Sequence, residues 1–439
     1  MTDRIPGFAT LAIHAGAQPD PTTGARATPI YQTTSFVFED VDHAASLFGL
    51  QTFGNIYTRI GNPTNAVLEE RVAALEGGTA GLAVASGHAA QVVVMHCLMQ
   101  PGDELVAAKK LYGGSINQFN HAFKNFGWHV VWAEPDDIGT FERAVSPKTK
   151  AIFIESIANP GGVITDIEAI GKIAKDAGVP LIVDNTLATP YLCKPIDYGA
   201  DIVVHSLTKF MGGHGTTMGG AIVDSGKFPW KDHAGRFAMF CEPDASYHGL
   251  VYVDRFGPAA YLARCRSVYQ RTTGSVLAPL SAFLLLQGIE TVALRVERHV
   301  ENARRVAEFL RGHKHVAWVN YVGFADNPYH ALAGKYLGGR VCSLLTFGVK
   351  GGYAAGTRFY DALKLVKRLV NIGDAKSLAC HPASTTHRQM SPEEQVTAGV
   401  RPETIRLSIG IEHIDDIIAD LDQALAASQS SHRVVIAAE

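Results

Sequence analysis

Seven short apolar runs recur between residues 80 and 225, and segments of helix length separate most of them. They read AGLAVAS (80–86), ELVAA (104–108), HVVWAE (129–134), AIFIES (151–156), PLIVDN (180–185), DIVVHS (201–206) and GGAIVDS (219–225). Continuous apolar runs, rather than strict alternation, are typical of strands that are covered on both faces. Intervening segments such as DIEAIGKIAKDAG (166–178) show helical spacing and end in glycine. The pattern predicts an α/β fold with a mostly parallel, doubly wound sheet.

The pattern changes on both sides of this predicted sheet. Residues 1–58 are rich in Pro, Thr and Gly and show little periodicity, which indicates an extended arm. Beyond about residue 273, long amphipathic helices (290–313) alternate with isolated strands (340–349), which indicates a smaller α+β domain. We therefore expect an arm at 1–58, a large domain at 59–272 with an aromatic and glycine-rich insertion at about 227–262, and a C-terminal domain at 273–439.

Composition excludes several classes of function. The formal net charge is −3 over 439 residues and no run of five like charges occurs, so nothing indicates a nucleic-acid partner. The N-terminus lacks the features of a secretory signal, and the most apolar segments, 82–99 and 276–288, are too interrupted or too short to span a membrane. Six scattered cysteines without a CxxC pair favour reduced thiols. We expect a soluble, cytoplasmic protein.

Polar residues gather where several predicted strands end. Asp184 ends one strand, while Ser206, Thr208 and Lys209 follow another. Ser86–Gly87 ends a third strand and begins a helix, whose N-terminus can bind an anion. Because ligands of open α/β sheets sit at the carboxyl ends of strands, we expect these groups to converge on one rim.

This set of groups suits pyridoxal phosphate. A lysine amine forms a Schiff base with its aldehyde, a carboxylate keeps the ring nitrogen protonated, and hydroxyl and helix N–H groups bind its phosphate. The residues alone leave open a nucleotide-binding α/β protein in which Lys209 is an ordinary surface charge. The glycine-rich loop at 212–220 has neither P-loop nor dinucleotide-binding spacing. We expect no metal site, because no pair with HxxxH spacing occurs among His205, His214, His381 and His387.

Eight ordered blocks resemble one known family. They are YTRIGNPT (57–64), ASGHAA (85–90), LYGGS (111–115), ESIANP (155–160), VDNTLATP (183–190), SLTKFMGGHG (206–215), NIGDAKSLACHPASTTH (371–387) and IRLSIGIEHIDD (405–416). Together they resemble the Cys/Met-metabolism family of pyridoxal-phosphate enzymes over nearly the whole chain. The resemblance implies the aspartate-aminotransferase-like fold, which is fold type I.

The resemblance also implies roles for individual residues at the cofactor. Lys209 would bind the cofactor aldehyde and later move protons, and Asp184 would face the ring nitrogen. Tyr112 would stack on the ring and, with Lys209, take part in catalysis. Asn159 would donate to the phenolate oxygen. The residues expected at the phosphate are Ser86, Gly87, His88 through its backbone, Ser206 and Thr208.

Further positions are implied outside this cofactor set. Tyr57 and Arg59 would cross from a neighbouring subunit to complete the phosphate site, which implies a homo-oligomer, expected to be a tetramer built as a dimer of dimers. Arg406 would clamp the α-carboxylate of an amino-acid substrate, Asn371 would support that clamp, and Tyr57 would also contact the substrate.

Within the family, three segments resemble O-acetylhomoserine sulfhydrylases: the insertion CEPDASYHGLVYVDRFG (241–257), ESIANP, and HPASTTHRQMSPEEQ (381–395). Gly114 also stands where methionine γ-lyases usually carry cysteine. The implied reaction is γ-replacement on O-acetylhomoserine by sulfide or methanethiol, a step of methionine biosynthesis. Methionine or cystathionine γ-lyase, cystathionine γ-synthase and O-succinylhomoserine sulfhydrylase remain alternatives. Thr272 departs from the pattern of the sulfhydrylases.

Overall fold

The computed structural model describes residues 6–159, 161–386, 388 and 400–430. The chain divides into two compact units. The large unit comprises residues 1–156 and 165–293, and the small unit comprises residues 157–164 and 294–439. The small unit thus takes one short segment from the middle of the large unit's sequence.

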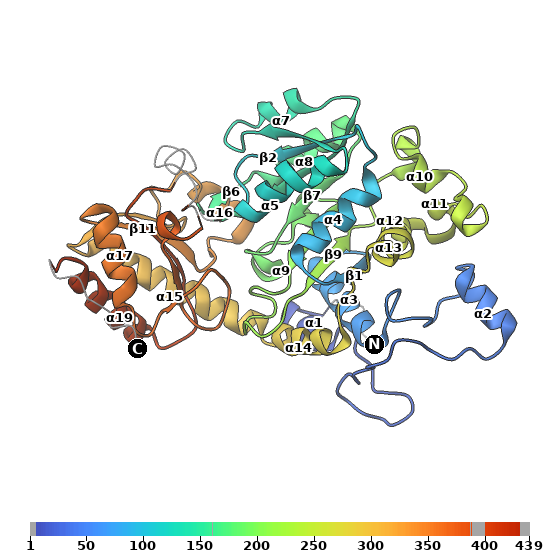
Figure 1. Ribbon diagram of the computed structural model, residues 1–439, viewed down its shortest axis with the longest axis horizontal. Helices are drawn as coiled ribbons and strands as arrows, with labels where there is room; N and C mark the ends of the chain where they lie inside the picture. The colour runs from blue at the N-terminus through green and yellow to red at the C-terminus, as the bar shows by residue number, and fades with distance from the viewer. Residues whose placement is uncertain (1–5, 160, 387, 389–399, 431–439) are drawn as a thin grey trace. The chain divides into compact units, whose positions relative to one another are not determined.

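The large unit is built on a seven-stranded sheet with the order β1-β9-β8-β7-β4-β2-β3 (Figure 1). Its strands are β1 (Ala80–Val84), β2 (Glu104–Ala108), β3 (His129–Ala133), β4 (Thr149–Glu155), β7 (Leu181–Asp184), β8 (Ile202–Ser206) and β9 (Gly220–Asp224). All neighbouring pairs from β8 to β3 are parallel, and β9 runs antiparallel to both β1 and β8. The prediction of a mostly parallel sheet from the seven apolar runs is confirmed.

Helices of the large unit precede, separate and follow these strands, and some of them begin and end at capping residues. The longer ones are α3 (Pro63–Glu76), α4 (Gly87–Leu98), α8 (Ile167–Ala177) and α14 (Pro279–Glu290). The side chain of Asn62 accepts from the Thr64 N–H at the start of α3, and left-handed Gly77 ends that helix. Because every residue of β9 and nearly every residue of β4 and β8 is buried, both faces of the central sheet are covered.

The N-terminal segment and the insertion add short elements to the large unit. The first contains α1 (Phe8–His14) and α2 (Val41–Phe48), and the second contains α10 (Ala238–Cys241), α11 (Tyr252–Phe256) and α12 (Ala260–Arg264). Trp230 of the insertion stacks on Tyr261 with ring centroids 5.5 Å apart and an angle of 9° between the planes. The insertion therefore has an aromatic core of its own.

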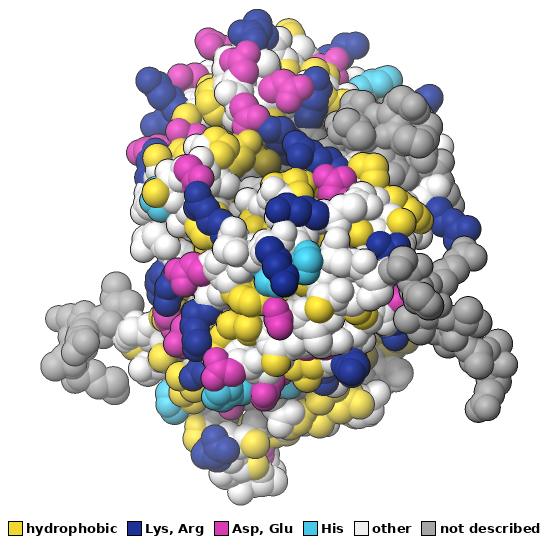
Figure 2. All heavy atoms as spheres, turned by 90° about the vertical axis from the view of Figure 1, so that its left-hand side faces the viewer, with side chains coloured by type: hydrophobic (Ala, Val, Ile, Leu, Met, Phe, Trp, Pro, Cys, Tyr) yellow, Lys and Arg dark blue, Asp and Glu magenta, His cyan; other side chains and the backbone are white. Residues whose placement is uncertain are grey.

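The small unit is an α+β arrangement around a five-stranded sheet with the order β10-β11-β14-β13-β12. Its strands are β10 (Val316–Asn320), β11 (Leu344–Val349), β12 (Lys367–Arg368), β13 (Leu378–Cys380) and β14 (Thr404–Ser408), and its helices include α16 (His330–Leu337), α17 (Gly352–Ala362) and α19 (Ile414–Ser428). The 21-residue helix α15 (Val292–Gly312) enters it from the large unit's sequence. On the face drawn in Figure 2, basic and acidic side chains are interspersed.

A two-stranded hairpin also belongs to the small unit. Its strands are β5 (Ile157–Ala158) and β6 (Val163–Ile164), which pair antiparallel. The Asn320 side chain at the end of β10 donates to the Gly161 carbonyl oxygen at 2.9 Å, so the hairpin is bonded to a strand 159 residues further along the chain.

Two further features concern the chain as a whole. Within the described ranges, no single helix has the length and apolarity to cross a membrane, although α14 and α15 pass that test together as a pair bent by 60°. All six cysteines are free thiols, and five of them are buried.

Candidate active site

The predicted rim of the large unit is formed by the ends of β7 and β8 and the start of α4. Asp184 is the last residue of β7, and Ser206 is the last residue of β8. Ser206 pairs with Gly220 of β9, which pairs in turn with Val84 at the end of β1. The sheet order therefore brings together the three strand ends that carry the predicted site residues Asp184, Ser206 and Ser86.

The start of α4 packs closely against the end of β8. Ser86 caps the helix by accepting a hydrogen bond from the Ala89 N–H at 3.1 Å. A β-carbon added at Gly87 would lie 2.8 Å from the Ser206 β-carbon. Only glycine permits this approach, which leaves helix N–H groups and the Ser206 hydroxyl side by side, as a phosphate requires.

Lys209 lies on a tight turn that follows Ser206. The Lys209 N–H donates to the Ser206 carbonyl at 3.2 Å, and the Lys209 carbonyl accepts from the Gly213 N–H at 2.7 Å. The Thr208 hydroxyl accepts from the Gly219 N–H at 3.1 Å. Leu207 and Phe210 are buried on either side, while Lys209 itself is half-buried. The backbone that carries the amine is therefore fixed at the rim.

Asp184 lies in an environment that disfavours its charge. Burial raises the pKa of its carboxyl, and hydrogen bonds from Thr186, the charge of His205 and the Gln91 amide oppose that rise. The Thr186 N–H donates to Asp184 Oδ1 at 3.0 Å, and Gln91 Nε2 lies 3.5 Å from Oδ2. A desolvated carboxyl of this kind is stabilised by a cationic partner, and a protonated pyridine nitrogen is such a partner. The residues present therefore fit pyridoxal phosphate.

Tyr112 presents an aromatic ring beyond the end of β2. Its N–H donates to Glu155 Oε1 at 2.7 Å, which ties it to the last residue of β4. Its side chain is 45% exposed and stacks on His88, with centroids 5.9 Å apart and planes at 27°. From the sequence only the backbone of His88 is expected to have a role, so this ring contact is a feature that the sequence does not predict. The exposed Tyr112 ring suits a stacking role.

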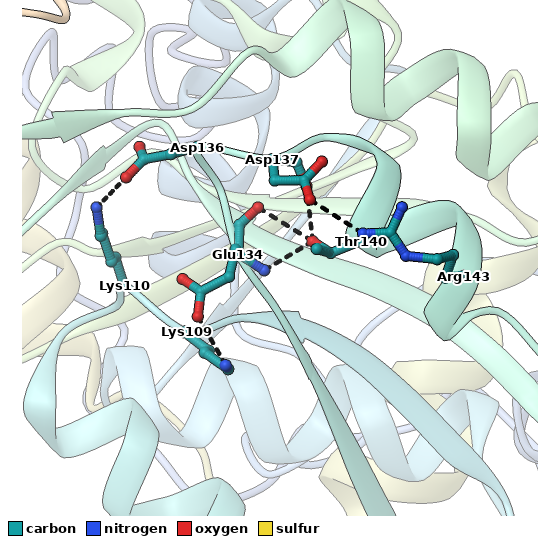
Figure 3. A network of polar contacts seen from close by, with 7 residues as sticks. All are labelled: Lys109, Lys110, Glu134, Asp136, Asp137, Thr140 and Arg143. Atoms are coloured by element: carbon teal, nitrogen blue, oxygen red, sulfur yellow. Dashed lines mark hydrogen bonds and ion pairs between the residues drawn. The ribbon is translucent and has the colours of Figure 1, made fainter.

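A network of ion pairs fixes the segment that leads to Tyr112 (Figure 3). Lys109 Nζ lies 2.6 Å from Glu134 Oε1, and Lys110 is paired with Asp136. These pairs join the residues after β2 to the residues after β3. Each exposed pair contributes no more than about 1 kcal/mol, but both act on the backbone that immediately precedes Tyr112.

The same network includes the start of α7 (Gly139–Ala144). The Thr140 hydroxyl accepts from the Glu134 N–H at 2.8 Å, and Arg143 pairs with Asp137 at 3.0 Å. No local pattern indicates the network, because its members are ordinary surface residues and its contacts join positions up to 26 apart in the sequence.

Tyr57 and Arg59 lie on the surface of the large unit. The Arg59 guanidinium lies 5.4 Å from the centre of the Tyr57 ring and donates to the Arg271 carbonyl at 2.7 Å. The neighbouring Thr272 hydroxyl donates to the Val268 carbonyl at 2.6 Å, and nothing in the structure explains its departure from the sulfhydrylase pattern.

Two of the residues assigned to the substrate, Arg406 and Asn371, come together in the small unit. Arg406 on β14 is only 8% exposed, and its guanidinium donates to Asn159 Oδ1 and to the Asn371 carbonyl, each at 3.3 Å. Asn159 thus contacts Arg406, although the family resemblance assigned Asn159 to the cofactor. A buried guanidinium between amide oxygens can bind a carboxylate through two parallel hydrogen bonds.

The histidines considered for a metal have other contacts. His205 is hydrogen-bonded to Glu76, His214 to the Gly212 carbonyl, and His381 to Ser384 and the Pro402 carbonyl. His387 lies outside the described residues. Among those that are described, no group of three or more His, Cys, Asp or Glu side chains could hold a metal ion.

Comparison with known proteins adds to this geometry. The O-acetyl-L-homoserine sulfhydrylase of Leptospira meyeri is 50% identical over 425 residues, which cover 95% of this chain and 96% of that protein. The homocysteine synthase of Schizosaccharomyces pombe is 49% identical over 419 residues, which cover 95% of this chain and 98% of that protein.

A solved structure matches the fold with a TM-score of 0.92 and 43% identity over 96% of this chain and all of that one. It is a Campylobacter jejuni protein described as an O-acetylhomoserine (thiol)-lyase with N'-pyridoxyl-lysine-5'-monophosphate. The family model for Cys/Met metabolism PLP-dependent enzymes matches residues 9–426. The chain therefore belongs to the Cys/Met metabolism family of pyridoxal-phosphate-dependent enzymes.

Proposed function

We propose that this chain is a transferase that replaces the acetyl ester of O-acetyl-L-homoserine with sulfide, or with methanethiol. In the sulfide reaction a C–S bond forms at Cγ, the C–O bond to acetate breaks, and the products are homocysteine and acetate. The observation that carries the chemistry is the rim on which the Asp184 carboxyl, the turn bearing Lys209 and the start of α4 meet. The choice of substrate rests on the sulfhydrylase and homocysteine synthase named above, which are about half identical to this chain.

Bound pyridoxal phosphate supplies an electron sink for the carbon skeleton of the substrate. Lys209 Nζ would bind the cofactor aldehyde carbon and then move protons at the Cα and Cβ of the substrate. Asp184 would hold a proton at the ring nitrogen, and Tyr112 would cover one face of the ring. The groups proposed for the phosphate are the backbone N–H groups of Gly87 and His88 and the hydroxyl or N–H groups of Ser86, Ser206 and Thr208.

The substrate carboxylate is assigned to Arg406. Its guanidinium is buried, and the oxygens of Asn159 and Asn371 hold it in one orientation. Its planar pair of donors matches a carboxylate better than the single ammonium of lysine does.

We further propose a cytoplasmic homotetramer in which Tyr57 and Arg59 complete the phosphate site of a neighbouring subunit. The arm around these residues carries strongly exposed apolar side chains: Val37 is 96% exposed, Val41 82% and Phe53 83%. Exposed apolar groups of this kind favour a protein interface. The six free thiols suit a reducing compartment.

The proposed reaction is tested by giving the cofactor-loaded protein O-acetyl-L-homoserine with and without sulfide. Homocysteine and acetate that form only with sulfide support the proposal. If 2-oxobutyrate and ammonia are the main products, the enzyme is a γ-lyase instead. If O-succinylhomoserine is turned over faster than the acetyl ester, the succinyl ester is the substrate. If cysteine in place of sulfide gives cystathionine, the enzyme is a cystathionine γ-synthase.

A further inference from the structure

The segment that carries Tyr57 and Arg59 is held to the large unit by a few specific contacts rather than by a core. Within the described range 48–60 no residue is buried, and Phe53 is 83% exposed. A segment without buried apolar side chains has little burial to offset the conformational entropy that it loses when it is ordered. Its path therefore depends on the hydrogen bonds that reach it from other elements.

Arg255 of the insertion (residues 227–262) binds one end of this segment. Its Nε donates to the Leu50 carbonyl at 3.1 Å, and its Nη2 donates to the Gln51 carbonyl at 2.5 Å. The guanidinium also lies 5.9 Å from the centre of the Phe53 ring. Two donors of one planar group thus bind two consecutive carbonyls, which fixes the direction of the backbone as well as its position.

Leu50 has a backbone conformation that leucine rarely adopts. Its φ is 56°, in the left-handed region, and it lies just beyond the end of α2 at Phe48. A leucine costs free energy there because its β-carbon crowds the backbone, so the conformation persists only where contacts determine it. The Leu50 N–H donates to the Leu47 carbonyl at 3.1 Å, and the Leu50 carbonyl accepts from Arg255. Arg255 is therefore one of the contacts that hold the turn after α2.

Arg255 is carried by an element that is itself anchored in the large unit. It belongs to α11, whose Tyr252 is fully buried, and the Tyr252 hydroxyl lies 2.9 Å from the Ser267 hydroxyl. The Tyr247 hydroxyl, also in the insertion, donates to the Ser267 carbonyl at 2.9 Å. Ser267 thus joins the insertion to the helical segment that leads to Arg271.

The other end of the segment is bound at Arg59. Arg59 donates to the Arg271 carbonyl at 2.7 Å, and the Arg271 guanidinium donates to the Tyr247 hydroxyl at 3.0 Å. The insertion therefore reaches both ends, through Arg255 at the turn after α2 and through Tyr247 near Arg59. Fixing both ends restricts the conformations of the residues between them, which include Tyr57.

We propose that Arg255 is a positioning residue for the cofactor site of a neighbouring subunit: it sets the path of the arm so that Tyr57 and Arg59 reach that subunit's phosphate group. This inference rests on the proposed function, in which Tyr57 and Arg59 complete the phosphate site of a neighbour. The insertion of one subunit then supports the site of another. Loss of Arg255 weakens the hold on the phosphate and leaves the groups at the pyridine ring unchanged.

The first test compares Arg255→Ala with wild type and with Lys231→Ala, which removes another exposed cation of the insertion, one paired with Asp254. Dissociation constants are measured for pyridoxal phosphate and for pyridoxal, which lacks the phosphate. We expect Arg255→Ala to bind pyridoxal phosphate about tenfold more weakly, because a misplaced Arg59 no longer donates a charged hydrogen bond to the phosphate. Its affinity for pyridoxal should equal that of wild type, and Lys231→Ala should follow wild type for both compounds.

The second test identifies the subunit that Arg255 serves. Arg255→Ala subunits are co-expressed with Lys209→Ala subunits under different affinity tags, and the mixed oligomer is purified. Absorption of cofactor joined to lysine reports only the sites that contain Lys209, all of which lie in Arg255→Ala subunits. Where the neighbour is a Lys209→Ala subunit, its arm is intact, so we expect a fraction of the sites to regain wild-type affinity. If every site keeps the weak affinity of Arg255→Ala, Arg255 acts on its own subunit and the inference is wrong.

Three results with Arg255→Ala alone also overturn the inference: wild-type affinity for pyridoxal phosphate, an equal loss of affinity for pyridoxal, and dissociation of the oligomer on size-exclusion chromatography. Arg59→Ala, mixed with Lys209→Ala in the same way, separates these failures from that of the proposed function. If that mixture regains no sites of wild-type affinity, Arg59 does not act across subunits and the proposed function is wrong on this point. If it regains them and the Arg255→Ala mixture does not, the assignment of Arg59 stands and the role of Arg255 falls.

Discussion

A β-carbon at Gly114 would lie 2.3 Å from Cε1 of the Tyr112 ring, so the ring occupies space that any other residue at 114 would fill. The same β-carbon would lie 3.0 Å from Cε1 of His88, the ring on which Tyr112 stacks. Glycine at this position is therefore a condition for the observed stack of Tyr112 on His88.

We expect Gly114→Ala to displace the Tyr112 ring and to weaken pyridoxal phosphate binding about tenfold, which corresponds to the loss of one aromatic stack of about 1.4 kcal/mol. Equilibrium dialysis and the cofactor absorption spectrum measure the effect. Gly113→Ala is a matched control, because nothing lies within 4 Å of a β-carbon at Gly113. Equal affinity in the two variants would show that the Tyr112 ring has no part in binding.

Replacing Lys209 with alanine removes the amine that we assign to the cofactor aldehyde and to proton transfer. We expect turnover of O-acetylhomoserine to fall by at least about 10³-fold, and borohydride no longer to attach the cofactor to the chain. Lys231→Ala changes an exposed lysine paired with Asp254 and should leave both properties intact. A rate for Lys209→Ala within tenfold of wild type would remove Lys209 from the mechanism.

Arg406→Ala should weaken substrate binding with little effect on cofactor binding. Hydrogen bonds to charged groups contribute about 1.5–3 kcal/mol, so we expect KM to rise about 10- to 100-fold. Arg406→Lys should recover only part of this loss, because lysine cannot form two parallel bonds to a carboxylate. Arg340→Ala, at an exposed pair with Glu297 in the same unit, is the control in steady-state assays. The assignment of Arg406 is excluded if KM stays at the wild-type value.

Two carboxyls, Asp201 and Asp224, lie at the end of the large sheet opposite the rim. They make the stability of the folded state depend on pH. Burial, together with the smaller effect of the nearby Asp201 charge, raises the pKa of Asp224 to about 7. Burial also raises the pKa of Asp201 to about 6. Because the usual value is 3.8, the folded chain binds these protons more tightly than the unfolded chain does. Their contribution to stability is therefore complete below about pH 4 and is lost as the pH rises through about 6 to 7.

Asp224→Asn removes one of these groups and should make the protein relatively more stable at alkaline pH. The quantity to compare is the free energy of unfolding of the variant minus that of the wild type. We expect this difference to increase by on the order of 1–3 kcal/mol from about pH 5 to about pH 8.5. Urea unfolding at the two pH values measures it. A difference from wild type that is the same at both pH values would contradict a titrating carboxyl at this position.

The sequence was sufficient to predict the large sheet because its signals are local. Each apolar run, such as that ending at Asp184, became a strand, and glycines such as Gly77 ended helices in the left-handed conformation. Parallel strands place their carboxyl ends on one edge, so the grouping of Asp184 with Ser206 followed from topology alone.

Other features depend on contacts that no local pattern records. Glu76 meets His205 across 129 residues, and Asn185 meets Glu76 across 109. The stack of His88 on Tyr112 depends on a neighbouring glycine whose role is to lack a side chain. Short helices such as α2 in the arm, which begins at the capping residue Asp40, were also missed, because one or two turns of helix give too little periodicity in a segment rich in turn residues.

The β5–β6 hairpin gives the chain an order of assembly during synthesis. Its residues leave the ribosome long before Asn320, whose side chain bonds to Gly161. At about 5–20 residues per second, a separation of 159 residues corresponds to a wait on the order of ten seconds. The large unit's sheet, complete at Asp224, can form during that interval, before the hairpin meets its partner strand. A single proteolytic cut in the chain cannot separate the two units, because the smaller one is made from two separate stretches of chain.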